Sequence, residues 1–141
     1  MTSGADLKEI VRQIFEARAE GDLDQLMSFI GDNCVFRIAG SRDLTPLTDP
    51  VVGHAALRAT MRQFIDTWEM KALEFVDICV EGNVALVHRK GQMRHGTTHF
   101  NTEVMDKMTF DNGKLVECVE FIDTLQTASL LNIATISAAQ R

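Results

Sequence analysis

Two carboxylates, Asp106 and Glu120, stand among the alternating apolar residues of the stretch 104–123, VMDKMTFDNGKLVECVEFID. Burial raises the pKa of a carboxyl group, and two such groups held close together do not both ionise at low cost. At least one could then act as a general acid or base, which is the chemistry of enolisation, aldol cyclisation or water activation. The structural alternative is that Asp106 caps a buried backbone group while Glu120 pairs with Arg37 or Arg89.

The turn inside this stretch decides whether the two carboxylates share a face of the sheet. Asp111-Asn112-Gly113 between two alternating runs predicts a β-hairpin, because Asn and Gly tolerate the positive φ of tight turns. A loop of two residues, Asn112 and Gly113, would put Asp106 and Glu120 on opposite faces. A loop of three residues closed by Gly113 would shift the register by one and put them on the same face. The alternation by itself leaves both registers open.

The rest of the chain supplies the elements that must position this hairpin. Apolar residues at helical spacing predict helices over 6–20, 23–30 and 54–69, and a C-terminal helix over 125–136. Period-two runs predict strands over 34–38, 73–80, 84–94, 99–110 and 115–122, of which the last four form an antiparallel meander. The segment 39–53 is predicted to be a loop, either a pocket rim or a passive connection. Three helices before a mostly antiparallel sheet indicate an α+β fold, whose curvature would leave a cone-shaped pocket.

Length and charge narrow the classes of function. Residues 1–141 are expected to form a single domain. A net charge of −6 and a pI near 5.1 argue against nucleic acid or an anionic membrane as a partner, because no basic patch is present to neutralise phosphates. No apolar run reaches the roughly 18 residues of a membrane span, and the N-terminal MTSGADLKEI lacks the apolar core of a signal peptide. A cytoplasmic location is therefore expected.

The cysteines and histidines give no sign of a metal or a cofactor. Cys34, Cys79 and Cys118 are far apart and form no CxxC pair, so they are predicted to be small buried hydrophobes. His95 and His99 bracket a predicted turn, with no obvious cluster of acidic residues beside them. We expect neither a bound metal nor a cofactor.

The order of elements resembles a known superfamily, and two motifs carry the likeness: EGDLDQLMSFIGDNCVF near the start and MTFDNGKLVECVEFID near the end. Both are similar to the SnoaL-like branch of the nuclear transport factor 2-like superfamily, to which ketosteroid isomerases and limonene epoxide hydrolases are related. The resemblance implies a cone-shaped barrel of curved, mostly antiparallel sheet with three N-terminal helices on its concave face. It also implies the three-residue hairpin loop closed by Gly113, with Glu120 on the concave face beside Asp106.

The match to ketosteroid isomerases is partial. Asp106 falls where those enzymes keep the protonated aspartate of their oxyanion hole. Their oxyanion-hole tyrosine falls at Ile14, and this chain contains no tyrosine. Their aspartate base falls near Arg37, which does not lose its proton at ordinary pH. The usual steroid isomerase mechanism is therefore not expected.

The match to epoxide hydrolases is also partial. Glu120 corresponds to the acidic residue of their last strand, and Arg89 to the arginine of their Arg-x-Asp triplet. The aspartate of that triplet is replaced by Gly91, which removes one of two carboxylates that activate water. Because His88 and Arg89 are neighbours on a strand, only one of them can enter the pocket, and the resemblance favours Arg89.

The residues and the resemblance together predict a binding site for a small apolar molecule. Its predicted catalytic residues are Asp106 and Glu120, and its predicted substrate-binding residues are Ile14, Phe36, Arg37, Phe64, Trp68, Arg89, Met108 and Cys118. Acid–base chemistry of the isomerase, cyclase or hydrolase type would follow from an open cone with both carboxylates inside. The alternative is a noncatalytic ligand-binding or association domain, favoured if the cone is closed by Met27, Phe36, Phe64 and Met108.

The opposite face of the sheet is predicted to meet a partner. It would present apolar residues that no helix covers, namely Met105, Thr109, Leu115, Val119 and Phe121. A symmetric homodimer through this face is the simplest expectation and is what the resemblance implies.

Overall fold

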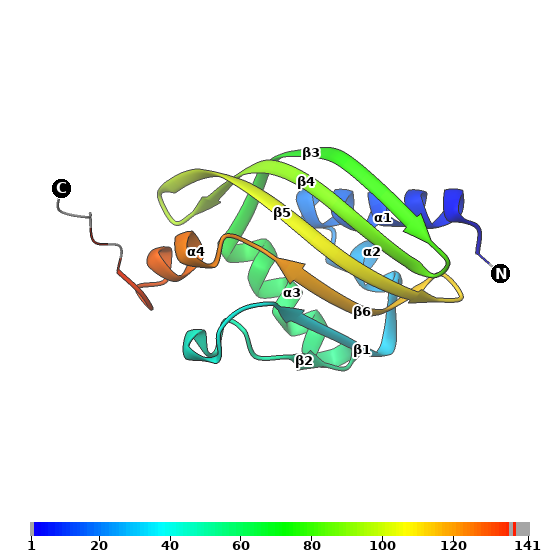
Figure 1. The fold of residues 1–141 in the computed structure, drawn as a ribbon, viewed down its shortest axis with the longest axis horizontal. Coiled ribbons are helices and arrows are strands. Elements are labelled where there is room, and N and C mark those ends of the chain that lie inside the picture. The colour runs from blue at the N-terminus through cyan, green and yellow to red at the C-terminus, as the bar shows by residue number, and fades with distance from the viewer. Residues whose placement is uncertain (1, 136, 138–141) are drawn as a thin grey trace.

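A six-stranded, strongly curved sheet forms the body of the molecule, and the helices α1, α2 and α3 lie on one side of it (Figure 1). The computed structural model describes residues 2–135 and 137. The helices are α1 Gly4–Glu20, α2 Leu23–Ser28, α3 His54–Thr67 and α4 Thr124–Leu130, with a 3₁₀ turn η1 at Arg42–Leu44. The strands are β1 Ile30–Ile38, β2 Val51–Val52, β3 Trp68–Glu81, β4 Val84–His95, β5 Thr98–Asp111 and β6 Lys114–Phe121.

The sheet has the order β2-β1-β6-β5-β4-β3, and only the β1–β6 pair is parallel. The prediction of an α+β fold with a mostly antiparallel curved sheet is confirmed. The sheet does not close into a barrel, because β2 and β3 remain its two edges. The helix α4, which follows β6, lies near the end of the sheet where the chain leaves it (Figure 1). No helix of the described residues is long and apolar enough to cross a membrane.

The first helix is fixed at both ends by local chemistry. Ser3 and Asp6 form a reciprocal capping box at its start. Gly21 ends it in the left-handed conformation with φ 76°, which glycine adopts without steric cost. The buried side chains of α1 come from one stripe, Leu7, Val11, Ile14, Phe15 and Ala17. This stripe packs against the sheet and orients the half-buried Arg18 at its border.

Several predicted boundaries were wrong by a few residues. The second helix ends at Ser28, and Ile30 already belongs to β1. The segment 39–53 is not wholly irregular, since it contains η1 and β2. The C-terminal helix ends at Leu130, and the predicted end at Ile136 lies outside the described residues.

A further boundary error lies where α3 passes directly into β3. Phe64 and Trp68 have helical spacing, yet the helix ends at Thr67 and Trp68 opens the strand. Arg18 accounts for the change, because its Nη2 donates hydrogen bonds to the carbonyl oxygens of Phe64 at 3.1 Å and Trp68 at 2.5 Å. Carbonyls at a helix end need partners from outside the helix, and α1 supplies one here.

The β5–β6 hairpin differs from both registers considered for it. Its loop has two residues, Asn112 with φ 49° and Gly113 with φ 77°, so the three-residue loop was wrong. A β-bulge then follows, because Phe110 pairs with Leu115 while Thr109 pairs with Glu117. The extra residue is Val116, and beyond it Asp106 lies opposite Glu120, as the three-residue loop would have placed them.

The bulge also changes the outer face of the sheet. Leu115, expected there, pairs with Phe110 in the hydrophobic core and is 5% exposed. Met105 and Phe121 are cross-strand partners that remain 45% and 52% exposed.

Candidate active site

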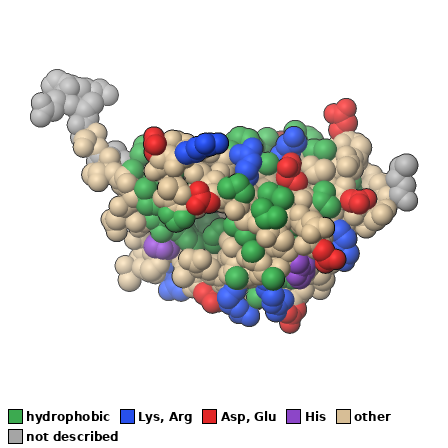
Figure 2. Space-filling model, turned by 90° about the horizontal axis from the view of Figure 1, so that it is seen from below, with side chains coloured by type: hydrophobic (Ala, Val, Ile, Leu, Met, Phe, Trp, Pro, Cys, Tyr) green, Lys and Arg blue, Asp and Glu red, His purple; other side chains and the backbone are tan. Residues whose placement is uncertain are grey.

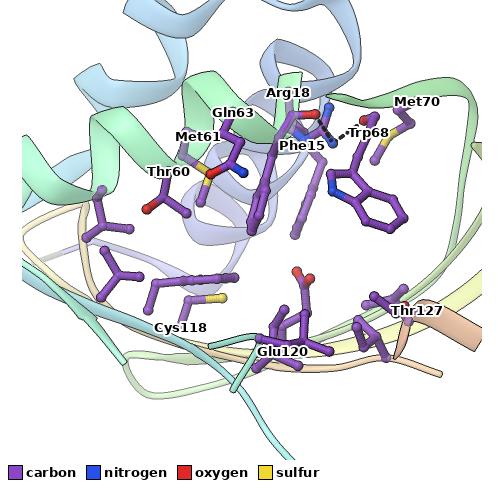
Figure 3. A pocket seen from close by; sticks show the side chains of 18 of the residues that line it. Phe15, Arg18, Thr60, Met61, Gln63, Trp68, Met70, Cys118, Glu120 and Thr127 are labelled. Atoms are coloured by element: carbon purple, nitrogen blue, oxygen red, sulfur yellow. Dashed lines mark hydrogen bonds between the residues drawn. The ribbon is translucent and has the colours of Figure 1, made fainter. Parts of the chain in front are cut away.

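A pocket of about 560 Å³ lies between the concave face of the sheet and the helices. Figure 2 shows a hollow between hydrophobic side chains on the face seen there, and Figure 3 shows the pocket from close by. A volume of this size suits a small organic ligand. The segment between β1 and α3 forms part of the wall through Pro46, Leu47 and Asp49, which favours the pocket-rim interpretation of this segment over a passive connection.

Most of the pocket wall is apolar and aromatic. Its aromatic members are Phe15, Phe36, Phe64, Trp68 and Phe100, and ring pairs such as Phe36–Phe64, with centroids 5.9 Å apart, hold them in place. The polar members are few: Arg18, Asp49, Thr60, Gln63, Arg89, Thr102, Glu120 and Thr127. Such a wall would desolvate an apolar ligand and orient it through a small number of polar contacts.

Glu120 extends into the pocket from β6, and its carboxylate points into the open space (Figure 3). One of its oxygens, Oε2, accepts a hydrogen bond from Nη2 of Arg89 at 3.0 Å. The side chain of Glu120 is 17% exposed, whereas that of Asp106 is not exposed at all. Glu120 is therefore the carboxylate that a bound molecule would meet.

Asp106 lies behind Arg89 and is not part of the pocket wall. Its Oδ2 accepts a hydrogen bond from Nε of Arg89 at 2.8 Å, and its Oδ1 has no donor among the described residues. Burial raises the pKa of Asp106 well above its usual value, against the opposing charge of Arg89. The nearby charge of Glu120 raises this pKa further. Asp106 therefore holds a proton more tightly than an ordinary carboxyl group does.

Arg89 joins the two carboxylates and is itself buried. Its guanidinium carbon lies 4.4 Å from the centre of the Phe15 ring, a cation–π contact that fixes its plane. Burial alone would lower the pKa of Arg89, but the charges of Asp106 and Glu120 outweigh it and raise this pKa. The neighbouring His88 faces the other way, where its ring bonds Glu103 at 2.5 Å. The expectation that Arg89 is the one to enter the pocket is met.

The structure brings most of the predicted site residues together. Those in the pocket wall are Ile14, Phe36, Phe64, Trp68, Arg89, Met108, Cys118 and Glu120. Arg37 is a correction: it is exposed and pairs with Val119 on the outer face of the sheet. Phe36 and Ile38 point inward, and side chains on a strand alternate, so Arg37 must point out. Phe36, Phe64 and Met108 line the pocket without closing it, and Met27 is not part of its wall.

Several wall residues were not predicted. The main ones are Arg18 from α1, Thr60 and Gln63 from α3, Met93 and Phe100 from the β4–β5 hairpin, and Thr127 from α4. Arg18 looks in the sequence like one more charged residue on an amphipathic helix. Its position beside the buried stripe was the only signal that it could face the interior.

Gly91 stands where the resemblance to epoxide hydrolases expects a second carboxylate. A Cβ atom at this position would lie 2.3 Å from the carbonyl oxygen of Ala72. The neighbouring strand has a bulge between Met70 and Ala72, which brings its backbone close to β4. No side chain fits at residue 91 without a shift of this backbone.

The cysteines at the site are buried and unreactive in character. Burial raises the pKa of Cys34 to about 11 and raises the pKa of Cys118 well above its usual value. Cys79 is exposed, so the prediction that all three are buried was wrong for this one. In the described part of the chain, no group of three or more His, Cys, Asp or Glu could hold a metal ion.

The sequence matches a known family over most of its length. The model of the SnoaL-like domain family matches residues 11–118. No curated protein is similar enough in sequence to count as a match.

Solved structures share the fold. A nuclear transport factor 2-like protein from Burkholderia xenovorans is 25% identical with a TM-score of 0.76, and the match covers 96% of this chain and 100% of that one. A protein from Rhodopseudomonas palustris, described provisionally as an isomerase, is 19% identical with a TM-score of 0.75 over 94% of this chain and 98% of that one. An LEH-like epoxide hydrolase from M. tuberculosis is 17% identical with a TM-score of 0.71 over 88% of each chain. At these identities the similarity establishes the fold, while the chemistry must be argued from the site.

Proposed function

Because the chain belongs to the SnoaL-like domain family, we propose that its pocket binds a small, mostly apolar molecule and that Glu120 exchanges a proton with it. The observation that carries this proposal is one carboxylate projecting into an apolar pocket of about 560 Å³ (Figure 3). A carboxylate held at a fixed point of such a pocket can act as a general base toward a molecule bound beside it. Arg89 holds this carboxylate in one orientation, which is what a positioned base requires.

The roles of the two predicted catalytic carboxylates then differ. Glu120 is the group that contacts the substrate. Asp106 is a positioning residue, which fixes Arg89 from behind and keeps a proton next to Glu120. The other acidic residue of the wall, Asp49, is exposed and accepts a hydrogen bond from Thr45. With only Glu120 of the two predicted carboxylates facing the substrate, the site suits proton abstraction and return, the reaction of isomerases and cyclases, better than hydrolysis by a pair of carboxylates.

The noncatalytic alternative has its own support. Arg89 forms an ion pair with each carboxylate, so the same three residues could act as a structural network beneath a ligand-binding pocket. The two functions agree on binding and differ on turnover. Measuring both ligand binding and turnover in the same protein distinguishes the two functions.

Binding can be followed through the only tryptophan of the chain, Trp68, which lies in the pocket wall. Titration with the neutral apolar probe N-phenyl-1-naphthylamine is expected to quench Trp68 fluorescence with one probe per chain. Thr102→Phe, which adds a ring to the pocket wall, should weaken the binding of the probe at least tenfold. Equal binding by this variant would show that the probe lies elsewhere.

Turnover can be tested without knowledge of the natural substrate. Exchange of the α-hydrogens of 2-octanone in D2O is expected to be accelerated by the wild-type protein and lost in Glu120→Gln. Hydrolysis of 1,2-epoxyoctane under the same conditions tests the hydrolase reaction. If neither compound reacts while the apolar probe still binds, the binding function stands and the catalytic function falls.

We also propose that two copies associate through the outer face of the sheet. Leu86, Met105 and Phe121 are 44%, 45% and 52% exposed there, and Met105 and Phe121 are direct cross-strand partners. Apolar side chains gathered on an uncovered sheet face are typical of a protein interface. A symmetric pairing would cover this patch on both copies at once.

A further inference from the structure

Arg18 lies on the wall of the pocket opposite Glu120 and takes no part in the ion pairs of Arg89 (Figure 3). Both hydrogen bonds that the structure gives it come from Nη2, to the carbonyl oxygens of Phe64 and Trp68. A guanidinium has five N–H groups. The remaining three, on Nε and Nη1, have no acceptor within the described part of the chain.

The positive charge of Arg18 is also without a paired anion. None of the salt bridges among the described residues includes it. Burial lowers the pKa of Arg18 to about 10, with the charge of Glu120 opposing this effect and that of Arg89 adding to it. A cation that has lost part of its water gains most from an electron-rich oxygen, because charge-assisted hydrogen bonds are strong where water is scarce.

We propose that Arg18 binds a carbonyl or carboxylate oxygen at one end of an otherwise apolar ligand. The geometry points to this class because the free N–H groups belong to a wall residue and the surrounding wall is formed by Phe15, Phe64 and Trp68. This inference rests on the proposed binding function and specifies the ligand it serves. An alkane or a simple terpene hydrocarbon would leave the N–H groups of Arg18 without acceptors and is excluded as the preferred ligand.

The inference also gives the proton transfer a second participant. When the carboxylate of Glu120 takes a proton from the carbon next to a carbonyl group, the C–H electron pair forms a C=C bond. The C=O π electrons then move onto oxygen, where Arg18 stabilises the developing negative charge. Return of the proton from Glu120 to the same or another carbon restores the carbonyl group, so the reaction needs no oxidant, reductant or metal.

The test compares three eight- or nine-carbon ligands that compete with N-phenyl-1-naphthylamine: 2-octanone, octanoate and 2-methyl-1-octene, in which a CH2 group replaces the ketone oxygen. Each is titrated into wild type, Arg18→Gln and Arg18→Lys. Arg12→Gln is the matched control, because Arg12 lies on the same helix but is exposed and meets only Glu9. Circular dichroism and the urea midpoint verify that each variant is folded.

Arg18→Gln is expected to weaken the binding of 2-octanone or octanoate by about tenfold, since a hydrogen bond to a charged group is lost. The affinity for 2-methyl-1-octene should remain unchanged. Arg18→Lys should retain part of the preference, and Arg12→Gln all of it. If only 2-octanone loses affinity, the ligand oxygen that Arg18 binds is that of a neutral carbonyl group. If only octanoate loses affinity, the ligand oxygen is that of a carboxylate. If all three ligands keep their wild-type ranking in Arg18→Gln, the inference is overturned while the proposed binding function survives. If the probe binds to wild type and none of the three ligands displaces it, the inference is overturned and the binding function stands. If the probe itself does not bind to wild type, the proposed function fails.

A second measurement covers the case in which Arg18→Gln does not fold, since Arg18 also anchors the end of α3. The infrared carbonyl stretch of 2-octanone bound to wild type is expected to lie below its value in heptane, because donation from a guanidinium weakens the C=O bond. The carboxylate stretches of bound octanoate are expected to shift from their values in water for the same reason. Unshifted bands in both bound 2-octanone and bound octanoate would contradict the inference without any variant.

Discussion

Asp106 and Glu120 lie directly opposite each other on β5 and β6, and Arg89 on β4 binds both of them. A two-residue turn followed by regular pairing would have placed Asp106 opposite Val119 and turned Glu120 away. The bulge at Val116 adds the one residue that corrects the register. In this sequence the two-residue turn and the bulge together set the register of the site.

Deletion of Val116 is expected to leave the fold and the Asp106–Glu120 pairing intact. Without it Leu115 is followed directly by Glu117, and the remaining residues of β6 alternate regularly in the register they now have. The cost should be about 1 kcal/mol of unfolding free energy for the lost half-buried side chain, measured by urea denaturation. Deletion of Val119 is the control, because it would force Glu117 inward or misplace Glu120. If the Val116 deletion is as damaging as the Val119 deletion, the bulge has another role.

Replacement of Arg89 by Met is expected to cost about 3–5 kcal/mol of unfolding free energy, because the buried Asp106 and the half-buried Glu120 lose the cation that they share. Adding Asp106→Leu to this variant should recover part of the loss. Arg37→Met, on the outer face of a nearby strand, should change stability by less than about 0.5 kcal/mol. Equal effects of the two arginine replacements would argue against a coupled Asp106–Arg89–Glu120 network.

The stability of the protein is expected to depend on pH through Asp106. Its pKa is raised in the folded state above the reference value of 3.8, so the folded protein binds more protons than the unfolded chain above that pH. The stabilisation from the bound proton is complete below pH 3.8 and is lost as the pH rises through the folded pKa. Asp106→Asn removes this titration and should gain stability relative to wild type as the pH increases from 4 to 8. Parallel urea midpoints for the two proteins over this range would disprove the raised pKa.

Thiol labelling should distinguish the three cysteines. With a thiol reagent at pH 8, the exposed Cys79 is expected to react quickly, and Cys34 and Cys118 only on unfolding. The native protein should therefore take up one equivalent rapidly, and Cys79→Ser should take up none. Rapid labelling in Cys79→Ser would mean that the pocket wall opens often enough to admit the reagent.

The proposed association predicts a mass of twice 15.7 kDa in sedimentation equilibrium. Phe121→Glu should give a folded monomer, because a charge would be buried in the apolar patch of both copies. Val52→Glu is the control, since Val52 is 62% exposed on the edge strand β2, away from this patch. A monomeric wild type at micromolar concentration would end this proposal.

Much of the architecture could be predicted from periodicity, because amphipathic helices and alternating strands leave clear patterns. The bulge could not, since the run Leu115–Phe121 has apolar residues at both odd and even positions and fits either register. Trp68 was predicted within a helix, because its spacing from Phe64 is helical. The local sequence does not show that Arg18, on another helix, binds the carbonyl oxygens of Phe64 and Trp68. The wrong placement of Arg37 could have been avoided. Neighbouring side chains on a strand point to opposite faces, so Arg37 and Phe36 could not both face the pocket.

Gly91 sets a limit on how this pocket could be redesigned. An engineer who wished to build a water-activating pair of carboxylates on either side of Arg89 would first try Gly91→Asp. The carbonyl oxygen of Ala72 already occupies the space that the new Cβ atom would need. Remodelling therefore has to begin with the bulge in β3. Gly91→Asp becomes possible only in a chain in which a change at this bulge has first moved the backbone of Ala72 away.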